Sequence, residues 1–249
     1  MRNGHLGMYI TKRDKALFEY LFLHKIATVV QIDRDVFRLG DLPHVHRRIR
    51  TLVKHGYLKT TTTTQRGRPK FAYYLSDRAF QSFIADRTQR QWAQLKSDSP
   101  DHDVVLTDIR RRFLELKNLR QFITENAIEA ELDCPKGLPV HAFQEMHSDG
   151  AAVYIAKGET FYIAIEYEDA QKAKARYAEH LAAYYVRNEI DCVIYVVREP
   201  SLRNVLVEVD ESLSHDRNSK LFVGNLADVL NPKKSLIFKN SHKEIFQLE

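Results

Sequence analysis

The stretch LPHVHRRIRTLVKHGYLKTTTTTQRGRPKFAYYL, residues 42–75, decides the fold of the amino-terminal part of the chain. Its first apolar residues recur at helical spacing, and they are Val45, Ile49, Leu52 and Val53. We therefore predict a helix over residues 44–55 with one buried stripe. Gly56 ends this helix, and the β-branched residues that follow favour a strand. Residues 65–70 form a turn, and residues 71–75 return as a second strand.

The flanking sequence supplies further helices. Thr11 is a plausible N-cap for a helix over residues 11–24, and a second short helix can start at Thr28. Residues 39–43 are a turn before the third helix, and Ser76 caps another helix after the hairpin. Three helices followed by a β-hairpin is the order of a winged helix-turn-helix, whose third helix enters the major groove of DNA.

Basic side chains lie where such a domain meets duplex DNA. On the third helix the candidates are His44, His46, Arg47, Arg48, Arg50 and Lys54, and on the hairpin tip they are Arg66, Arg68 and Lys70. The helix residues are placed to reach bases and phosphates, and the hairpin residues to follow a phosphate or enter a minor groove. The simpler alternative is that these charges only solvate an amphipathic helix. The order of helix, turn and basic hairpin favours binding to DNA.

The charge is divided unevenly along the chain. Residues 1–95 hold 18 Lys and Arg against 7 Asp and Glu, whereas the other 154 residues hold 20 against 26. A basic segment joined to an acidic one indicates a polyanion-binding module attached to a second domain. We place the boundary in the polar residues 96–101, which gives domains of residues 1–95 and 102–249.

The composition excludes several protein classes. Apolar residues make up 44% and charged residues 29% of the chain, which is typical of soluble globular proteins. No apolar stretch is long enough to span a membrane, so no membrane partner is expected. The two cysteines fit a reducing, cytoplasmic compartment rather than a disulfide scaffold. The nine glycines form no phosphate-binding loop.

Residues 102–249 alternate helical and strand patterns. We predict a long helix over 102–127, a strand over 128–133, a hairpin of strands 151–156 and 161–168, a helix over 169–188, and a buried interior strand over 191–197. Residues 200–249 are expected to complete the edge of the sheet. This αβββαβ order predicts an α/β domain built on one sheet.

Three carboxylates lie at one end of the predicted hairpin. Asp149 precedes its first strand, and Glu166 and Glu168 end its second strand on the same face, because strand side chains alternate. Neighbouring carboxylates repel unless a proton or a cation separates them, and Mg²⁺ favours few carboxylates with waters and a substrate phosphate. Such an ion would activate water and neutralise charge on a scissile phosphate. The alternative is an acidic strand end that faces solvent.

Taken together, these segments resemble the replication-relaxation family of mobile-element proteins. The resemblance covers about residues 10–190 and rests on Thr11-Lys-Arg-Asp14, Ala27-Thr-Val-Val-Gln31, residues 47–58, Tyr74-Leu-Ser76, His102-Asp103, Asp108-Ile-Arg110, Ser148-Asp-Gly150 and Ile165-Glu-Tyr-Glu168. Members of this family are thought to bind DNA in plasmid replication and mobilisation, and their second domain resembles the PD-(D/E)xK nuclease fold. The resemblance thus implies an α+β winged helix-turn-helix followed by a restriction-endonuclease-like α/β domain.

The resemblance also assigns roles to the carboxylates. By position, Asp149 is the motif's aspartate and Glu166 its first acidic residue. Glu168 stands where nuclease members usually have a lysine, which helps to position and activate the attacking water. Lys172 or Lys174 on the next helix is a candidate for that role, and Glu125 is a candidate fourth acid. The catalytic candidates are Asp149, Glu166, Glu168 and Lys172, and the first three are the candidate ligands of Mg²⁺ or Mn²⁺.

Three functions are compatible with this sequence. The first is a DNA-binding protein of a bacterial mobile genetic element, acting as a regulator of transcription or as an accessory of replication or mobilisation, with no cofactor needed for binding duplex DNA. The second is a metal-dependent DNA endonuclease that uses Asp149, Glu166 and Glu168. The third is an adaptor whose acidic domain recruits a replication or conjugation protein. Winged-helix proteins commonly dimerise on palindromic sites, so a homodimer fits by analogy.

Overall fold

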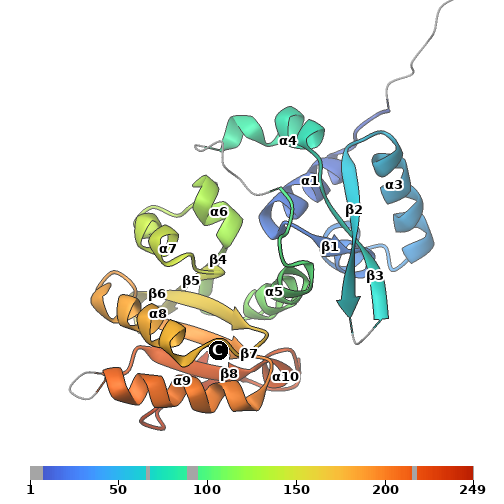
Figure 1. The fold of residues 1–249 in the computed structure, drawn as a ribbon. Coiled ribbons are helices and arrows are strands. Elements are labelled where there is room, and N and C mark those ends of the chain that lie inside the picture. The colour runs from blue at the N-terminus through green and yellow to red at the C-terminus, as the bar shows by residue number, and fades with distance from the viewer. Residues whose placement is uncertain (1–7, 66–67, 89–94, 215–217, 249) are drawn as a thin grey trace, which may run out of the picture. The chain divides into compact units, whose positions relative to one another are not determined.

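The computed structural model describes residues 8–65, 68–88, 95–214 and 218–248. The chain divides into two compact units, residues 1–107 (unit 1) and 108–249 (unit 2) (Figure 1). The division falls inside helix α5 (Pro100–Phe113) and not in the polar residues before it, where the sequence analysis placed it.

The first turns of α5 belong to unit 1 because their side chains pack there. Val104 joins Ile26 and Ala72 in one buried apolar cluster. The carbonyl of Val104 also accepts a hydrogen bond of 2.8 Å from Gln31 Nε2, and Thr107 Oγ1 lies 3.2 Å from the imidazole of His24. The expected domain of residues 1–95 is therefore completed by about two turns of this helix.

Unit 1 combines helices with an antiparallel sheet in the strand order β1-β3-β2. Its elements are α1 (Lys12–His24), β1 (Ala27–Thr28), α2 (Val29–Ile32), the π-helix η1 (Asp33–Phe37), α3 (Leu42–Lys54), β2 (Leu58–Gln65), β3 (Arg68–Leu75), α4 (Asp77–Phe83) and the 3₁₀ helix η2 (Ala85–Arg87). The helices predicted from Thr11, Thr28 and Ser76 are present, each with that residue as its N-cap.

Capping boxes begin the first two helices. Asp14 N–H donates to Thr11 Oγ1, while the carboxylate of Asp14 accepts a hydrogen bond of 2.7 Å from Thr11 N–H. Thr28 and Gln31 repeat this exchange at the start of α2. A side chain in this position satisfies a backbone donor that the helix leaves free, which typically contributes about 1 kcal/mol.

Two boundaries in unit 1 differ from those predicted. Helix α3 begins at Leu42, because the Asp41 side chain caps it and Pro43 in its first turn lacks an N–H that would need a partner. The hairpin strands are also longer than predicted, so Arg68 and Lys70 lie in β3 rather than in a turn. The predicted stripe of α3 is buried at Val45, Ile49 and Leu52, whereas Val53 is half-buried.

Unit 2 is built on a mixed sheet in the strand order β10-β9-β8-β7-β6-β5-β4. After α5 its elements are β4 (Leu119–Thr124), α6 (Glu125–Ala130), α7 (Val140–Met146), β5 (Gly150–Ala156), β6 (Glu159–Glu168), α8 (Lys174–Val186), β7 (Cys192–Val197), α9 (Pro200–Leu213), β8 (Leu221–Asn225), α10 (Leu226–Val229), β9 (Leu236–Lys239) and β10 (Ile245–Leu248). Strands β6, β7 and β8 are parallel, and the other neighbours are antiparallel. The prediction of an interior strand at β7 is confirmed, and all its side chains are buried.

The long helix predicted over residues 102–127 is wrong, because the chain turns after Phe113 and continues as β4. Leu119 and Ile123 are four residues apart, a spacing that fits one face of a helix and equally one face of a strand. The strand predicted over residues 128–133 is also wrong. Thr124 caps α6 there, and Glu131 ends it in the left-handed conformation, with φ of 52°.

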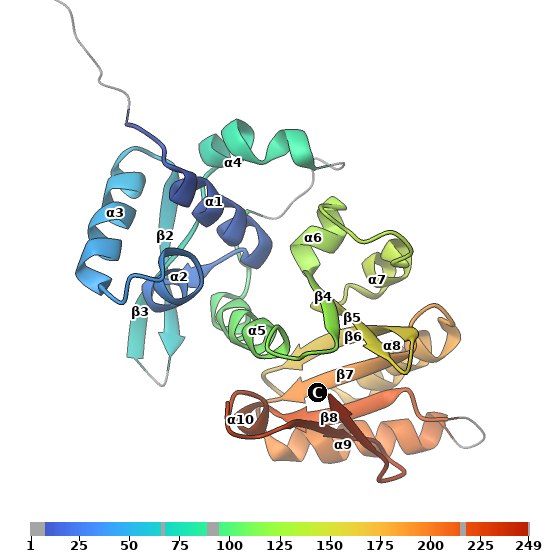
Figure 2. The ribbon, with the colours of Figure 1, turned by 180° about the vertical axis from the view of Figure 1, so that it is seen from behind.

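The helix predicted from residue 169 begins five residues later, at Lys174. Together with α9, this helix covers one face of the sheet, and the second half of α5 lies on the other face (Figure 2). On that side the ring of Phe113 packs against the rings of Phe122 and Phe238. Residues 200–249 supply three strands on one side of β7, as expected, and also the unpredicted helix α9.

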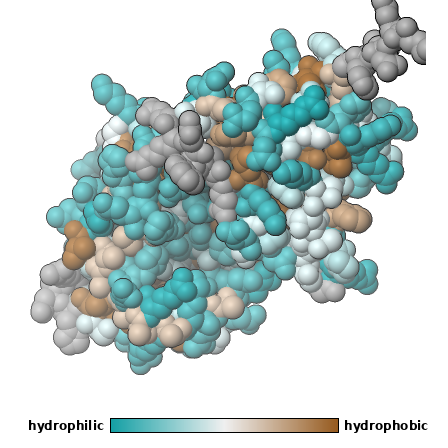
Figure 3. Space-filling view, turned by 45° about the horizontal axis from the view of Figure 1, so that its top comes forward, coloured by the Kyte–Doolittle hydropathy of each residue, from teal (hydrophilic) through white to brown (hydrophobic). Residues whose placement is uncertain are grey.

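The face of the molecule in Figure 3 is largely polar. On this face, hydrophilic residues dominate and apolar residues occur in small separate groups. In the described part of the chain, no helix has both the length and the apolar character needed to cross a membrane.

Candidate nucleic-acid interface and acidic cluster

The outward face of α3 is basic. Opposite its buried stripe, the side chains of Arg47, Arg50 and Lys54 are exposed and His46 is half-buried. With Pro43 and Thr51 these residues line a surface groove of about 500 Å³. Among the described residues, none of these three long cationic side chains takes part in an ion pair, and α3 itself contains no Asp or Glu. This face therefore presents uncompensated positive charge.

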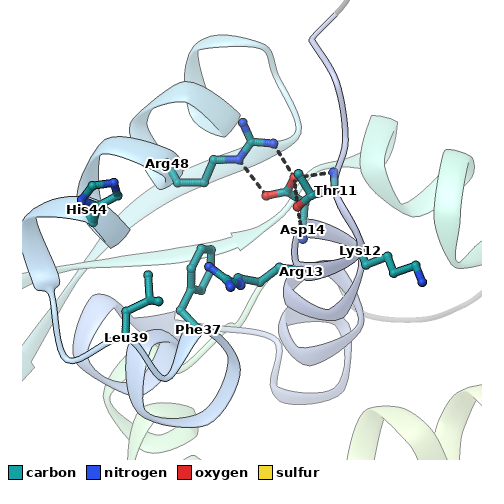
Figure 4. Close-up of a pocket in the computed structure, with 8 residues that line it drawn as sticks. All are labelled: Thr11, Lys12, Arg13, Asp14, Phe37, Leu39, His44 and Arg48. Carbon is teal, nitrogen blue, oxygen red and sulfur yellow. Dashed lines mark hydrogen bonds and ion pairs between the residues drawn. The ribbon is translucent and has the colours of Figure 1, made fainter.

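Arg48 does not belong to that face. Its Nε donates to Asp14 Oδ1 at 2.8 Å, its second guanidinium nitrogen pairs with Asp14 Oδ2, and that nitrogen also donates to the Tyr9 carbonyl at 2.9 Å (Figure 4). Burial alone would raise the pKa of Asp14, but hydrogen bonds from Arg48 and Thr11 hold this pKa below its ordinary value. Arg48 was predicted from the sequence to bind DNA, but in the structure it points to Asp14 and joins α3 to α1.

His44 lies in the first turn of α3. Its Nδ1 is 3.3 Å from the carboxylate of Asp41, the residue that caps this helix. Together with Phe37 and Leu39 it lines a cavity of about 630 Å³ that reaches Arg48 and the start of α1 (Figure 4). His44 is thus exposed at the amino end of α3, close to the turn that precedes it.

The hairpin places further cations on unit 1. Arg68 and Lys70 are exposed on β3, whereas Arg66 lies outside the described residues. The carboxylate of Asp101 accepts hydrogen bonds from Thr63 Oγ1 and from the backbone N–H of Thr64. These bonds fix β2 to the start of α5 near the end of the hairpin.

The structure brings Asp149 and Glu166 together in unit 2. Gly150 of β5 pairs with Ile165 of β6, so the residues beside them meet at the same end of the hairpin. Asp149 Oδ2 accepts a hydrogen bond of 2.7 Å from the backbone N–H of Tyr167. The backbone of Glu125 donates to the carbonyl of Asp149 at 3.2 Å, which brings the start of α6 to the same place.

Glu166 is buried and unfavourable as an anion. Burial raises its pKa well above the ordinary value, and the charges of Asp149 and Glu125 add to that effect. A hydrogen bond from the Tyr184 hydroxyl and the charge of Lys172 oppose it. Since Tyr184 donates its proton to Glu166, it accepts one from Ser148 Oγ, 2.7 Å away.

Glu168 has a different partner. Its carboxylate forms an ion pair of 2.8 Å with Lys172 Nζ, and the backbone N–H of Lys172 donates to the Tyr177 hydroxyl at 2.9 Å. The lysine that the sequence analysis placed beside the acids is therefore there, but on the loop before α8 rather than on the helix. Lys174, the alternative, instead pairs with Glu208 of α9.

The groups that surround the acids were not predicted from the sequence. His180 Nε2 lies 3.1 Å from the Met146 carbonyl, which only accepts, so this nitrogen carries the proton, and Nδ1 accepts from the Tyr195 hydroxyl at 2.8 Å. Burial lowers the pKa of His180, which favours its neutral form. Tyr184 and His180 lie four residues apart on α8, a spacing that places both on the face toward β6.

The three acids do not form one ligand set for a metal ion in this structure. Across the described ranges, no three or more His, Cys, Asp or Glu side chains are grouped at a spacing that would hold an ion. Glu168 is occupied by Lys172, which leaves Asp149 and Glu166 as a pair of neighbouring carboxylates.

Comparisons with known proteins return few matches. No protein-family model matches the chain, and no curated protein does. Among solved structures, restriction endonuclease FokI aligns with a TM-score of 0.30 and 10% identity, and FokI bound to DNA with a TM-score of 0.25 and 13% identity. Each alignment covers 90% of this chain and 45% of the FokI chain, so this chain spans less than half of that protein's length. At this level, the likeness assigns neither a fold nor a function to this chain.

Proposed function

We propose that the protein binds duplex DNA through unit 1, with α3 in the major groove and the β2–β3 hairpin along the phosphate backbone. In this proposal unit 1 is a winged helix-turn-helix, in which α2 and η1 precede the turn, α3 reads the groove and the hairpin is the wing. Arg38 and Gly40 supply the tight turn before α3, with φ of 54° and 65°.

The observation that carries this proposal is the charge on α3. One side of the helix is fully buried and the other exposes Arg47, Arg50 and Lys54, with no carboxylate on the helix to neutralise them. Such an arrangement has little value for folding, since these side chains touch no ionic partner. It suits a duplex, because each neutralised phosphate releases counterions.

The resemblance suggests the setting for this activity. We propose a cytoplasmic protein of a bacterial mobile element that regulates transcription or assists replication or mobilisation. The order α5-β4-β5-β6-α8-β7, with α6 and α7 inserted, supports the nuclease-like αβββαβ topology for unit 2. Unit 2 would then act as a scaffold, as a dimerisation domain, or as the contact for a replication or conjugation protein.

The test is duplex binding by the whole chain. A mixed-sequence duplex is titrated with the protein and binding is followed by fluorescence anisotropy at several salt concentrations. The variant Arg47→Ala with Arg50→Ala should bind at least about tenfold more weakly, because a base or phosphate contact contributes about 1–3 kcal/mol. The matched control exchanges two exposed cations of unit 2, Lys136→Ala with Lys233→Ala. If both variants lose the same affinity for the duplex, the binding is only a nonspecific attraction between charges.

A second candidate function is a metal-dependent DNA endonuclease. The observation that favours it is the repulsion between Asp149 and Glu166, which a bound cation would relieve. Mg²⁺ or Mn²⁺ bound there would neutralise charge on a scissile phosphate. The acidic cluster fits a divalent metal ion only in part, because Glu168 is paired with Lys172 and the described residues offer no group of three ligands.

Incubation with supercoiled plasmid separates the two functions. Nicking in Mn²⁺ that is absent in EDTA, and absent in Asp149→Asn, would establish the endonuclease. Glu129→Gln, a half-buried acid on α6 that is not in this cluster, is the matched control. Intact plasmid together with a salt-sensitive gel shift would leave DNA binding as the function.

A further inference from the structure

A cavity of about 390 Å³ lies in unit 2 beside the carboxyl end of β8. Strands β8 and β9 are paired where Val223 lies opposite Lys239, and since side chains alternate, Asn225 shares the face of these two residues. Arg203 of α9 lines the same cavity, so the cavity opens on the face of the sheet that α9 covers. Its volume falls within the range of small-molecule sites, about 300–1,000 Å³.

The cavity carries an excess of positive charge. Its cations are Arg203, Lys234 and Lys239, and its one carboxylate is that of Asp228. Lys234 pairs with Asp228, and this hydrogen bond lowers the pKa of the carboxyl group below its usual value. Arg203 and Lys239 have no ion pair in the part of the chain that the structure describes. Two cations therefore remain for an anionic ligand.

Asn225 adds an acceptor to this cavity. Its Oδ1 is buried, and none of the described residues donates a hydrogen bond to it. The Asn225 side chain also helps to lower the pKa of the Asp228 carboxyl group, so these two residues lie beside each other in the cavity lining. A buried acceptor of this kind lowers stability unless a ligand or a water donates to it.

The loop that carries Lys234 and lines the cavity is held by hydrogen bonds. Arg112 of α5 donates to the backbone carbonyl of Lys234 and, through its other terminal nitrogen, to Glu115 at 2.7 Å. The backbone N–H of Lys233 donates to Asn231 Oδ1 at 3.0 Å. The loop that carries Lys234 thus has a defined conformation before any ligand arrives.

We propose that this cavity binds a nucleoside phosphate, with the phosphate on Arg203 and Lys239 and a donor group of the sugar or base on Asn225 Oδ1. The site is independent of the proposed functions, because neither α3 nor the acidic cluster contributes to it. A free nucleotide and the phosphorylated end of a nucleic-acid strand share this chemistry, and the experiment distinguishes them.

The test is calorimetric titration of the whole chain. The probes are AMP, adenosine, inorganic phosphate, and a single-stranded hexanucleotide with and without a 5′-phosphate. We expect one site for AMP or for the phosphorylated strand. The single variants Arg203→Ala and Lys239→Ala should each weaken binding by about tenfold, as expected for the loss of a charge-assisted hydrogen bond. Asn225→Ala should abolish the preference for AMP over inorganic phosphate.

Two controls make the result specific. Lys233→Ala removes an exposed cation next to the cavity that does not line it, and should bind like the unchanged protein. The variant Arg47→Ala with Arg50→Ala should lose duplex binding and keep this site. AMP binding identifies a free nucleotide, and binding of the phosphorylated strand alone identifies a nucleic-acid end. Failure of every probe to bind, or binding that survives Arg203→Ala and Lys239→Ala, overturns the proposal.

Discussion

Arg48 of α3 forms an ion pair with Asp14 in the first turn of α1, with 2.8 Å between Nε and Oδ1. Asp14 is only 1% exposed, so its carboxylate depends on this partner and on Thr11 for compensation. The two neighbouring arginines, Arg47 and Arg48, consequently have separate tasks. Arg47 is available to a ligand, and Arg48 fixes the orientation of α3, the helix that carries both residues.

Arg48→Ala should therefore destabilise the protein, whereas Arg47→Ala should not. Removing Arg48 leaves the buried Asp14 carboxylate with only its hydrogen bonds from Thr11, and we expect a loss of about 2–3 kcal/mol in the free energy of unfolding. Urea denaturation followed by circular dichroism measures this difference. Equal midpoints for the two variants would show that the pair contributes nothing to folding.

The same pair makes stability depend on pH. The pKa of Asp14 is lowered in the folded protein, so its contribution is complete above the ordinary carboxyl pKa of about 4 and is lost as the pH falls below it. Asp14→Asn should reduce this loss of stability at low pH, as measured by denaturation curves recorded between pH 5 and pH 2.5. Asp86→Asn, at an exposed carboxylate that has no ion pair among the described residues, serves as the matched control. If Asp14→Asn leaves the loss of stability at low pH unchanged, the ionisation of Asp14 does not contribute to that loss.

Glu166→Gln should stabilise unit 2 at neutral pH. The raised pKa of Glu166 means that the folded state resists its ionisation, so its contribution to stability is favourable at low pH and decreases as the pH rises above the ordinary value. An amide of the same shape still accepts the proton of Tyr184 and carries no charge. We expect a gain of about 1–2 kcal/mol at pH 7.5 that disappears near pH 4.

Chemical denaturation at both pH values measures this effect, with Glu168→Gln as the comparison. Glu168 forms an ion pair with Lys172, so its substitution should bring no gain. A gain that is the same at both pH values would trace to packing rather than to the charge of Glu166. A gain at pH 7.5 alone, combined with loss of any plasmid nicking, would mean that this carboxylate lowers stability in order to serve a reaction.

Local signals predicted unit 1 well. Capping residues such as Thr11 and Thr28, the stripe on α3 and the stop at Gly56 act over a few residues, and the structure has each of them. What the sequence could not reveal was the direction of Arg48. Three arginines within four residues look alike, and only the position of α1 decides which of them meets Asp14.

Unit 2 was harder to predict because its signals are ambiguous or distant. The spacing of Leu119 and Ile123 fits a helix or a strand, and pairing with β5 decides between them. The hairpin that carries Asp149 and Glu166 was predicted from two strand-like runs and the turn at Lys157-Gly158 between them. Tyr184, which donates a hydrogen bond to Glu166, comes from a helix whose aromatic residues indicated core packing or a dimer contact. Asn225 and Arg203 carry no motif, and only the fold brings them together.

The hairpin should add to DNA affinity through phosphates. Arg68 and Lys70 are exposed on β3, where they can neutralise backbone charge without reading bases. Replacing both by Ala should weaken binding to any duplex sequence to a similar extent and reduce the slope of log affinity against log salt by about 2. Arg47→Ala with Arg50→Ala should in addition change the ranking of duplex sequences, because α3 faces the bases in the complex that we propose. Anisotropy titrations of a small set of duplexes at four salt concentrations separate these effects. A salt slope unaffected by the β3 substitutions would assign the whole interface to α3 and leave the hairpin without a role in binding.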